Sequence, residues 1–550
     1  MDTPAPLLTA AAANPTGKVG RREWTGLAVL ALACLVYSMD LTVLHLAVPQ
    51  ISAELRPTSS QLLWIIDVYG FLVAGLLLTM GTIGDRIGRR RLLMAGAAAF
   101  AAVSIIAAFA PSAPVLIACR ALLGVAGATL APSTLSLIFT MFRDPAQRSI
   151  AVGVWVGSFS VGGSIGPLAG GIMLEHFWWG AVFLLAVPVM VMLLILAPRV
   201  LPEYRDPHAG RLDLLSAVLC TSAILLVVFG MKKLAQDGPV PSAVGAMAAG
   251  LLVGGIFVRR QLTSAEPMLD LRLFRHSSFR TALTINMVAI FAAFGYFLFV
   301  GQYFQLVLGM SPLQAGIATI PAGLGFMIGS QLGPRLSRFI RPAYMIGGGM
   351  AMAATGLLLL TRITLEGGVT ITVIASLLVS FGLAPVFGIT TELTVGTAPP
   401  EQSGAASGLA ETGAEFGGAL GISMLGSLSI AIYRGQLSDT LPYGLRDDDA
   451  RAARDTLGAA MEVANALPGK LGTAVADAAK QAFLTGMHLT SAIAAAAALV
   501  LAVIALVRLR HIEAGELATD PHAPASPAPQ CLDGSHEVVA VEKVPAGRDE

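Results

Sequence analysis

Long apolar segments alternate with short polar ones along most of the 550-residue chain. Each apolar segment is close to or longer than the ~20 residues that a helix needs to cross a lipid bilayer. Inside a bilayer the backbone must satisfy its own hydrogen bonds, which favours helices over irregular chain. We therefore predict an all-α membrane protein with fourteen transmembrane helices, at residues 25–48, 61–83, 92–110, 113–141, 149–174, 178–198, 212–230, 242–258, 280–308, 312–333, 342–361, 368–391, 402–431 and 483–508.

Basic residues test the orientation of these helices. Lysine and arginine are concentrated in every second loop, except after residues 368–391, and such loops stay in the cytoplasm. The loops on the other side hold few bases, namely Arg56, Lys232, Lys233 and Arg362. Residues 1–24 lack a signal-peptide cleavage pattern, so we expect the first span to be retained. The pattern predicts a multi-pass protein of the cytoplasmic membrane with both termini in the cytoplasm.

An internal repeat divides the chain into two halves. Glycines of segment 149–174 reappear 251 residues later in segment 402–431, the first set being Gly153, Gly157, Gly162, Gly166 and Gly170, and the second Gly404, Gly408, Gly413, Gly417 and Gly421. Parallel repeats of this kind are common in membrane transporters. We therefore predict two six-helix bundles, at 25–205 and 280–510, with two further helices inserted between them at 206–279.

Three segments fall outside the predicted bilayer. Residues 1–24 are expected to form a cytoplasmic N-terminal segment. Residues 434–480 mix alanine with charged residues and are expected to form a partly helical extracellular loop within the second bundle. Residues 511–550 are rich in proline, alanine and charge without apolar periodicity, which predicts a disordered cytoplasmic tail.

The amino-acid composition argues against several other classes of protein. The chain is 55% hydrophobic and 13% charged, whereas a soluble domain carries about 25% charged residues. Its net charge of +1 gives no reason to expect a nucleic-acid partner. The four cysteines are far apart and form neither a metal-binding spacing nor a disulfide framework. No G-x-x-x-x-G-K-S/T loop is present, so we expect neither ATP as an energy source nor a cofactor.

A polar segment rich in arginine, GTIGDRIGRRR at Gly81–Arg91, separates two of the predicted helices. Its glycines Gly81, Gly84 and Gly88 would allow close packing and chain reversal, and its acid, Asp85, lies next to Arg86, Arg89 and Arg90. We predict a tight gating loop at the membrane surface. The pattern G-x-x-G-D-R-x-G-R-R resembles the loop between helices 2 and 3 of the major facilitator superfamily.

Further motifs narrow this resemblance, which extends from residue 25 to about 510. The segment Met39–Pro49 is similar to the D-x-T motif of that family's fourteen-helix drug:proton antiporters, with His45 in place of the usual asparagine. Arg120-x-x-x-Gly124 resembles the arginine motif of proton-driven members. The residues of segment 149–174 that resemble the antiporter signature are Gly162, Gly166, Pro167, Gly170 and Gly171. The resemblance implies a multidrug efflux transporter.

Charges inside the predicted helices are the candidates for chemistry, because each is costly in a bilayer. Asp40 lies well inside 25–48 and Arg120 lies in 113–141, and we predict that they pair and carry proton coupling. The alternative is a static ion pair that only fixes helix packing. Asp67 is expected near the outer end of 61–83, either as a vestibule acid that attracts cations or as part of a solvated helix end. A lone helical histidine such as His45 could titrate but is more often hydrogen-bonded.

Two further acids, Glu411 and Glu415, are one turn apart and share a face of 402–431. Their repeat partners are Ser160 and Ser164, so one half has gained two carboxylates. Neighbouring carboxylates repel, which favours proton uptake. We predict a site for protons or cationic substrate, with a wet vestibule as the alternative.

The proline and glycines of 149–174 suggest a mechanical role. Pro167 removes a backbone hydrogen bond and can bend the helix, and Gly166 permits close packing; ordinary small-residue packing is the alternative. Aromatic residues could attract flat cations, and the candidates are Trp64, Tyr69, Trp155, Phe159, Phe291, Phe294, Tyr296 and Tyr303.

Together these observations predict a monomeric, proton-driven antiporter and not an enzyme. Its partners would be protons, the lipid bilayer and small amphipathic substrates, often cationic drugs such as quaternary ammonium compounds, dyes and antibiotics. One alternative is a dedicated exporter of a single endogenous metabolite or antibiotic. A non-transporting membrane receptor is a second alternative from another class. A sugar importer is less favoured, because few asparagines or glutamines lie in these helices.

Overall fold

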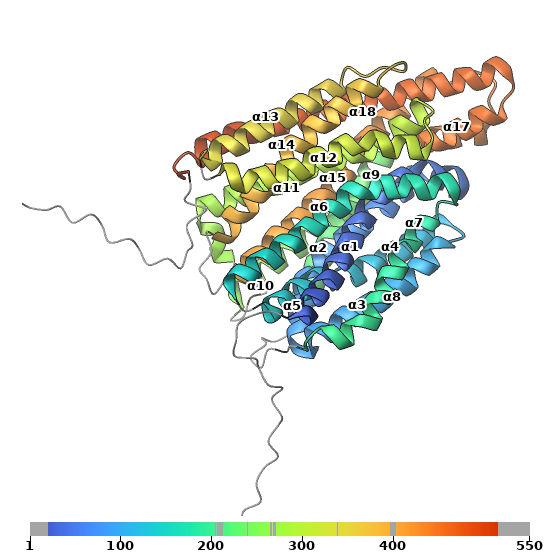
Figure 1. Cartoon of the computed structure of the whole chain (residues 1–550). Coiled ribbons are helices and arrows are strands. Elements are labelled where there is room, and N and C mark those ends of the chain that lie inside the picture. Colours follow the sequence, from blue (N-terminus) through green and yellow to red (C-terminus); the bar gives the residue numbers. More distant parts are fainter. Residues whose placement is uncertain are drawn as a thin grey trace, which may run out of the picture.

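The computed structural model describes residues 20–142, 144–203, 205, 213–238, 240–264, 267, 271–337, 339–396 and 403–514. All regular elements in these ranges are helices (Figure 1). In chain order they are α1 (Arg21–Leu55), α2 (Ser59–Ile87), α3 (Arg89–Ala108), α4 (Ala113–Gly127), α5 (Leu130–Met141), α6 (Pro145–His176), α7 (Ala181–Leu184), α8 (Ala186–Val200), α9 (Leu214–Asp237), α10 (Pro241–Thr263), η1 (Leu271–Arg275), α11 (Ser277–Gln302), the π-helical turn η2 (Tyr303–Val307), α12 (Pro312–Leu336), α13 (Pro342–Leu360), α14 (Val369–Gly396), α15 (Ser403–Thr440), α16 (Asp447–Asp455), α17 (Leu457–Ala466) and α18 (Gly469–Arg508).

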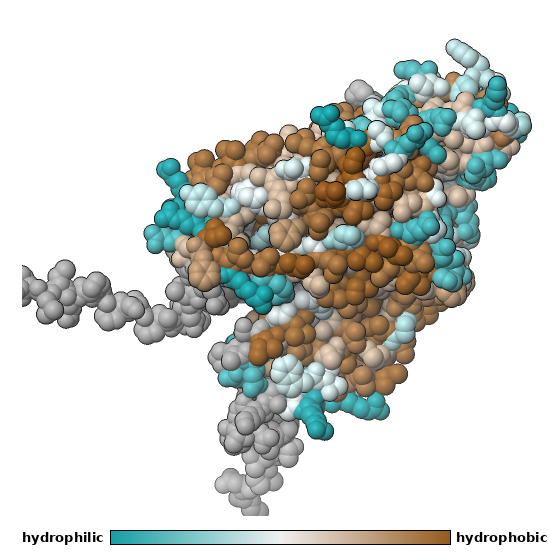
Figure 2. Space-filling view, turned by 45° about the horizontal axis from the view of Figure 1, so that its top comes forward, coloured by the Kyte–Doolittle hydropathy of each residue, from teal (hydrophilic) through white to brown (hydrophobic). Residues whose placement is uncertain are grey.

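The helices have the length and polarity of membrane spans. Thirteen spans of the described chain are long and apolar enough to cross a bilayer, or fourteen if the two parts of the bent helix α6 form one span. Within these spans, α4 continues into α5, α7 into α8, and α11 into η2. A broad apolar surface covers the sides of the helices, and hydrophilic residues gather toward their ends (Figure 2). The prediction of an all-α, multi-pass membrane protein is confirmed. Residues 1–19 of the predicted N-terminal segment 1–24, and residues 515–550 of the predicted tail 511–550, lie outside the described residues.

Two bundles of helices lie side by side. Helices α1 to α8 pack on one another, and α11 to α15 pack with α18. The two bundles meet along two helix pairs, α6 with α12 and α2 with α15. Figure 1 shows α6 and α12 running side by side. The same helix packing recurs inside each bundle. Gly166 of α6 lies against the carbonyl of Met39 in α1, and Gly417 of α15 lies against the carbonyl of Met287 in α11.

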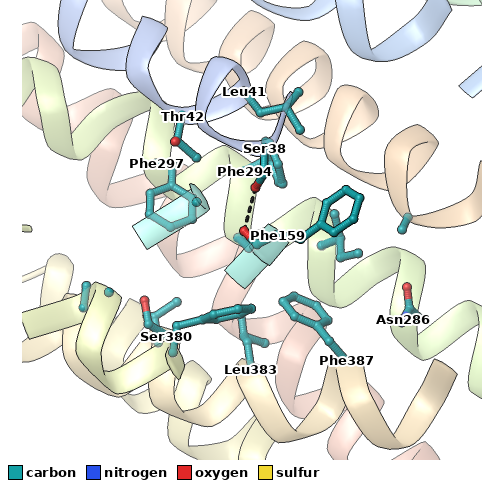
Figure 3. A pocket seen from close by; sticks show the side chains of 18 of the residues that line it. Ser38, Leu41, Thr42, Phe159, Asn286, Phe294, Phe297, Ser380, Leu383 and Phe387 are labelled. Atoms are coloured by element: carbon teal, nitrogen blue, oxygen red, sulfur yellow. Dashed lines mark hydrogen bonds between the residues drawn. The ribbon is translucent and has the colours of Figure 1, made fainter. Parts of the chain in front are cut away.

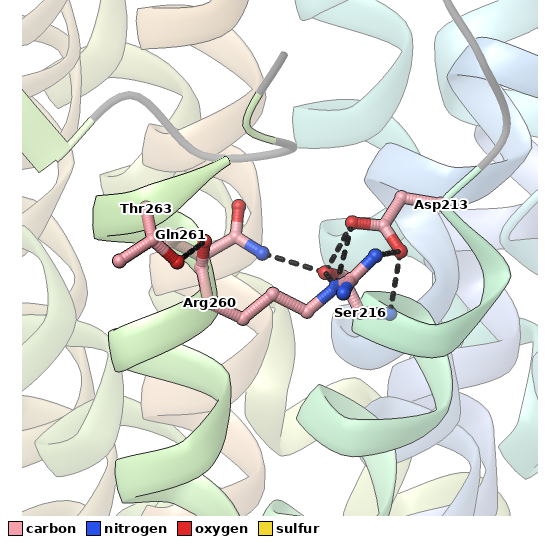
Figure 4. Close-up of polar contacts among 5 residues, drawn as sticks. All are labelled: Asp213, Ser216, Arg260, Gln261 and Thr263. Carbon is pink, nitrogen blue, oxygen red and sulfur yellow. Dashed lines mark hydrogen bonds and ion pairs between the residues drawn. The ribbon is translucent and has the colours of Figure 1, made fainter. Parts of the chain in front are cut away.

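The two inserted helices form a hairpin beside this interface. Helix α9 packs on α2 and on α15, so it touches both bundles, while α10 packs along α9. Phe71, Val228 and Ala419 form a small apolar cluster where α2, α9 and α15 meet. At one end of the hairpin the Arg260 guanidinium contacts the Asp213 carboxylate at 3.0 Å (Figure 4).

The predicted extracellular loop at 434–480 is shorter and more helical than expected. Helix α15 continues to Thr440 and α18 begins at Gly469, because both segments remain helical beyond their apolar parts. The short helices α16 and α17 lie between them. Gly458 of α17 packs against Ser52 of α1, and Arg56 forms an ion pair with Glu462. We call this end of the helices the cap end, and the opposite end, which carries Arg89 and Arg90, the arginine end.

Candidate functional site

A buried ion pair joins two helices of the first bundle. Nη1 of Arg120 in α4 lies 2.7 Å from Oδ2 of Asp40 in α1, and the side chains are 1% and 7% exposed. Arg120 also donates Nε–H to the carbonyl of Ile65 at 3.0 Å, and its guanidinium lies 4.6 Å from the ring centre of Tyr69. Asp40 and Arg120, which were predicted to pair from the sequence, are therefore in contact. Because both are buried, removing either charge would leave the other without a counter-ion in a low-dielectric environment.

A series of ring contacts and one hydrogen bond leads from this pair to the second bundle. Tyr37 of α1 donates its hydroxyl to Oε1 of Glu415 in α15 at 2.8 Å. The Tyr37 ring centre lies 6.1 Å from that of Tyr69, which covers Arg120. Sequence reasoning missed Tyr37, although it stands three residues before Asp40 and so lies one helical turn away. The residues in contact order are Asp40, Arg120, Tyr69, Tyr37 and Glu415.

The position of Asp67 excludes one of the two settings predicted for it. This acid is 1% exposed, so it is not part of a solvated helix end. Helix α2 begins eight residues earlier, at Ser59, whose hydroxyl donates to the carbonyl of Asp455 at the end of α16. Asp67 lines a small cavity of about 100 Å³ that also contains Glu415. One carboxylate from each bundle therefore faces the same space.

A larger cavity of about 400 Å³ lies between the bundles (Figure 3). Its walls come from α1 and α6 of the first bundle and from α11, α12, α14 and α15 of the second. Glu411 is the acid among its described lining residues, and the cavity shares Leu41, Ile290, Phe294 and Ala414 with the smaller one. The two neighbouring acids of α15 are thus divided between two adjoining cavities, with Glu411 in the larger and Glu415 in the smaller.

Aromatic rings form much of the larger cavity, as in many sites for flat or cationic ligands. Of the rings singled out in the sequence, Trp155, Phe159 and Phe294 line it. Tyr69 instead covers Arg120, and Tyr303 donates its hydroxyl to the carbonyl of Thr364. Sequence reasoning missed three lining rings, Phe297, Phe326 and Phe387, together with Asn286.

His45 departs from the hydrogen-bonded state expected of it. The residue is 4% exposed, and neither ring nitrogen has a hydrogen-bond partner among the described residues.

The arginine-rich segment is not a loop along its whole length. Helix α2 continues through Gly81, Gly84 and Arg86 to Ile87, and α3 begins at Arg89. Only Gly88 separates them, with φ of 111°, a conformation that glycine adopts without steric strain. The chain therefore reverses direction at one residue, Gly88, rather than over the longer loop that was predicted. A side chain at Gly84 would come within 2.9 Å of Cδ of Arg89, so this glycine allows the arginine to lie across α2.

The partners of the arginines also differ from the prediction. Asp85 contacts Arg89 at 2.6 Å. Arg90 instead contacts Glu203 at 3.5 Å and donates to the carbonyl of Leu201 at 2.9 Å. Glu203 also lies 3.6 Å from Arg91. Sequence reasoning missed Glu203 because it stands more than a hundred residues later, beyond the end of α8.

Helix α6 carries the residues that resemble the antiporter signature, and they face two different neighbours. Gly162 and Gly166 lie against carbonyls of α1, and Gly170 lies against Val43 of the same helix. Gly171 faces the other bundle, where a Cβ would approach the Pro312 carbonyl of α12 at 2.7 Å. The helix bends by 41° between Ile150–Gly163 and Ile165–His176. Pro167 accounts for the bend, because its ring displaces the carbonyl four residues earlier. The side chains of Ser160 and Ser164 lie outside the described residues.

Known proteins share both the sequence and the fold. The family model of the Major Facilitator Superfamily matches residues 30–422. The multidrug efflux pump LfrA of Mycolicibacterium smegmatis is 41% identical over 492 residues, covering 90% of this chain and 97% of the relative. The methyl viologen resistance protein SmvA of Salmonella typhimurium is 35% identical, covering 88% and 97%.

Solved structures agree at the level of the fold. A bacterial homolog of the human lysosomal transporter Spinster, in an inward-facing conformation, matches with a TM-score of 0.60 and 17% identity, covering 90% of this chain and 98% of that one. The peptide transporter POT in complex with sulfate matches with a TM-score of 0.61 and 14% identity, covering 91% and 97%. The chain belongs to the major facilitator superfamily, as its motifs predicted, and is a membrane transporter rather than an enzyme.

Proposed function

We propose that the protein is a proton-driven antiporter that exports lipophilic, often cationic compounds across the cytoplasmic membrane. The observation that carries this proposal is the aromatic cavity between the bundles with Glu411 in its wall. An apolar, ring-lined space with one described acid suits a flat organic cation, because rings and carboxylate both attract positive charge. Two relatives support the substrate class, one named a multidrug efflux pump and one named for resistance to methyl viologen, a dication.

The proposed orientation places the arginine end and both termini in the cytoplasm. The bias of lysine and arginine in the loops supports it. In this orientation the larger cavity is reached from the cytoplasm, because the bundles are in close contact on its cap-end side. There Gly171 faces the Pro312 carbonyl, Gly316 faces the Pro167 carbonyl, and Gln305 donates to the Leu46 carbonyl at 2.9 Å.

Proton coupling is assigned to Asp40 and Arg120 and to the series of contacts that leads from them to Glu415. In the present conformation Arg120 holds Asp40 as its counter-ion. If α4 moved relative to α1, the acid would lose that partner and bind a proton in its apolar surroundings. The contact of Tyr37 with Glu415 links this event to the second bundle. Protonation of Glu415 or Glu411 would weaken cation binding and shift the balance between conformations.

The segment between α2 and α3 is assigned to gating. Gly88 joins the two helices, and the ion pair of Asp85 with Arg89 holds the end of α2 against the start of α3. The bend of α6 at Pro167 would change as the bundles rock about the contact of α6 with α12.

The test is transport by the purified protein in liposomes that contain the pH indicator pyranine. With an imposed pH gradient, adding ethidium should release protons at a rate that saturates with dye, and a protonophore should abolish dye accumulation. Dye movement that is indifferent to the gradient would contradict the antiporter. A panel of neutral and cationic compounds then separates a multidrug exporter, which moves many of them, from an exporter dedicated to one metabolite.

A further inference from the structure

One side chain in the wall of the larger cavity has an unsatisfied polar atom. Asn286 of α11 is 3% exposed and lines the cavity (Figure 3). Its amide nitrogen donates to the hydroxyl of Thr390 in α14 at 2.8 Å, and it lies 3.4 Å from the hydroxyl of Thr391. Its carbonyl oxygen, Oδ1, has no donor among the described residues. A buried acceptor without a donor costs about 1–3 kcal/mol, so this atom favours a ligand that brings one.

The contact with Thr390 fixes which end of the amide remains unsatisfied. The Thr390 hydroxyl donates its hydrogen to the Val386 carbonyl at 2.7 Å, so toward Asn286 it can only accept. The NH2 group of Asn286 must therefore face Thr390, and the carbonyl oxygen must face away from it. Because a flipped amide would place two acceptors against each other, the neighbouring helix determines the orientation.

Several other polar side chains of the cavity wall already donate hydrogen bonds within the protein. The hydroxyls of Ser38, Thr42 and Thr319 donate to backbone carbonyls at 2.7, 3.1 and 2.7 Å. The indole N–H of Trp155 donates to Thr134 at 3.0 Å. Ser38 is the position of the first bundle that corresponds to Asn286. The residues that face the repeated glycines show this, because they align at the same offset: Leu35, Met39 and Val43 in α1, and Leu283, Met287 and Phe291 in α11. The second bundle thus has a free acceptor where the first has a satisfied hydroxyl.

We propose that Asn286 is a specificity-determining residue whose Oδ1 accepts a hydrogen bond from an N–H group of the exported compound. The cavity would then have two polar anchors, the Glu411 carboxylate for the positive charge and Asn286 for a donor. The favoured substrates are flat aromatic cations that carry amino or amidine groups, rather than cations whose nitrogens are fully alkylated. This inference rests on the proposed function, because it names the substrate class of that same cavity.

The test compares two dyes with the same flat acridinium core. Proflavine carries two NH2 groups, and acridine orange carries dimethylamino groups in the same places, so only the exocyclic donors are lost. Their dissociation constants are measured by fluorescence titration of the full-length protein in nanodiscs. For Asn286→Leu we expect the Kd of proflavine to rise about three- to tenfold, which is the contribution of one hydrogen bond, and that of acridine orange to change less than twofold.

A second variant keeps Asn286 and removes what orients it. Thr390→Val has nearly the same shape but offers no acceptor, so the amide is free to flip, and proflavine binding should weaken less than in Asn286→Leu while acridine orange binding stays within twofold. Thr394→Val is the matched control: it makes the same change one helical turn along α14, where the hydroxyl donates to the Thr390 carbonyl at 2.7 Å and the residue is not among the described lining residues of the cavity. The ratio of the two constants should stay near that of the parent protein. Size-exclusion profiles report whether each variant is folded.

The outcomes separate this inference from the proposed function. Suppose that the parent protein binds both dyes. If Asn286→Leu then weakens the binding of both dyes equally, or of neither dye, the acceptor role is wrong while cation export stands. An amide that is satisfied by water alone would leave the binding of both dyes unchanged. If the parent protein binds neither dye, the proposed cation site fails, and the acceptor role fails with it. A proflavine-selective loss in both Asn286→Leu and Thr390→Val supports the inference.

Discussion

The two bundles of this transporter share a backbone arrangement and differ in their chemistry. In each, a glycine-bearing helix packs closely on its neighbour, α6 on α1 and α15 on α11. The first bundle holds the buried pair of Asp40 with Arg120. The second holds Glu411, Glu415, Asn286 and additional rings of the larger cavity. The repeat preserves the close helix contacts, which set the packing, while the charged positions have diverged. Under the proposed function, the first bundle would exchange protons, and the second would supply most of the rings and polar groups that bind substrate.

The largest effect should come from breaking the chemistry of the first bundle. Asp40→Asn resembles a permanently protonated acid, so we expect proton release on adding substrate to stop while substrate binding persists. Arg120→Ala leaves Asp40 buried without its counter-ion and should destabilise the protein by about 3–5 kcal/mol. Pyranine-loaded liposomes measure the first effect, and thermal unfolding followed by size exclusion measures the second.

A double variant separates coupling from packing. Asp40→Asn with Arg120→Gln removes both charges, so stability should return toward that of the parent while proton release remains absent. If Asp40→Asn liposomes still released protons at the parent rate, the pair would only fix helix packing. The coupling acid would then have to be sought on α15.

The next effect tests whether the shared backbone is equally rigid in both halves. Gly166 and Gly417 occupy equivalent positions, but a methyl group at Gly417 would collide with the Met287 carbonyl, whereas at Gly166 it would first meet the Thr42 hydroxyl, which can rotate. We expect Gly417→Ala to lower stability by about 1–3 kcal/mol and Gly166→Ala to lower it less. Gly153→Ala, with open space around it, is the control. Equal losses at Gly166 and Gly417 in thermal unfolding would contradict the difference.

A smaller and more selective effect should distinguish the two acids of the second bundle. Glu411 lines the larger cavity, and Glu415 accepts a hydrogen bond from Tyr37 of the first bundle. Glu411→Gln should weaken binding of a cationic dye about tenfold and leave a neutral compound nearly unaffected, since a charged partner is lost. Glu415→Gln should instead slow proton release for both kinds of substrate. Identical profiles for the two variants would mean that the acids act as one site.

The sequence was sufficient for the elements that depend on local composition. Apolar runs predicted the spans, because each run lies within one helix, and the glycine spacing predicted the repeat, because the same spacing recurs in two helices. Pairing across helices was predicted only for Asp40 and Arg120, where burial of an arginine in a bilayer demands an anion. The contacts of Glu203 with Arg90, and of Tyr37 with Glu415, join residues more than a hundred positions apart. No local pattern marks such partners, and the burial of Asp67 likewise depends on helices distant in sequence.

The smallest effect concerns the α9–α10 hairpin, which belongs to neither bundle yet touches both through α9. Asp213, just before the span that begins at Leu214, accepts hydrogen bonds from Ser216 and Arg260. Partial burial alone would raise the pKa of Asp213, but these hydrogen bonds and the Arg260 charge outweigh it and hold the pKa below its usual value. An acid with a lowered pKa in the folded protein contributes stability above its unfolded pKa of about 3.9. That contribution is lost as pH falls through the folded value.

We therefore expect no change in the hairpin between pH 7 and 5, and loosening of its arginine end only below about pH 4. Asp213→Asn should loosen it already at pH 7, by about 0.5–1 kcal/mol, or two- to fivefold faster hydrogen exchange. Exchange of peptides from α9 and α10 measures this, with Asp449→Asn as the control, since its partner Arg446 lies at the cap end. An acid-induced step that persisted in Asp213→Asn would assign the sensitivity to another group. If transport survived the loosened hairpin, rocking of the bundles would not require a rigid connection between them at this end.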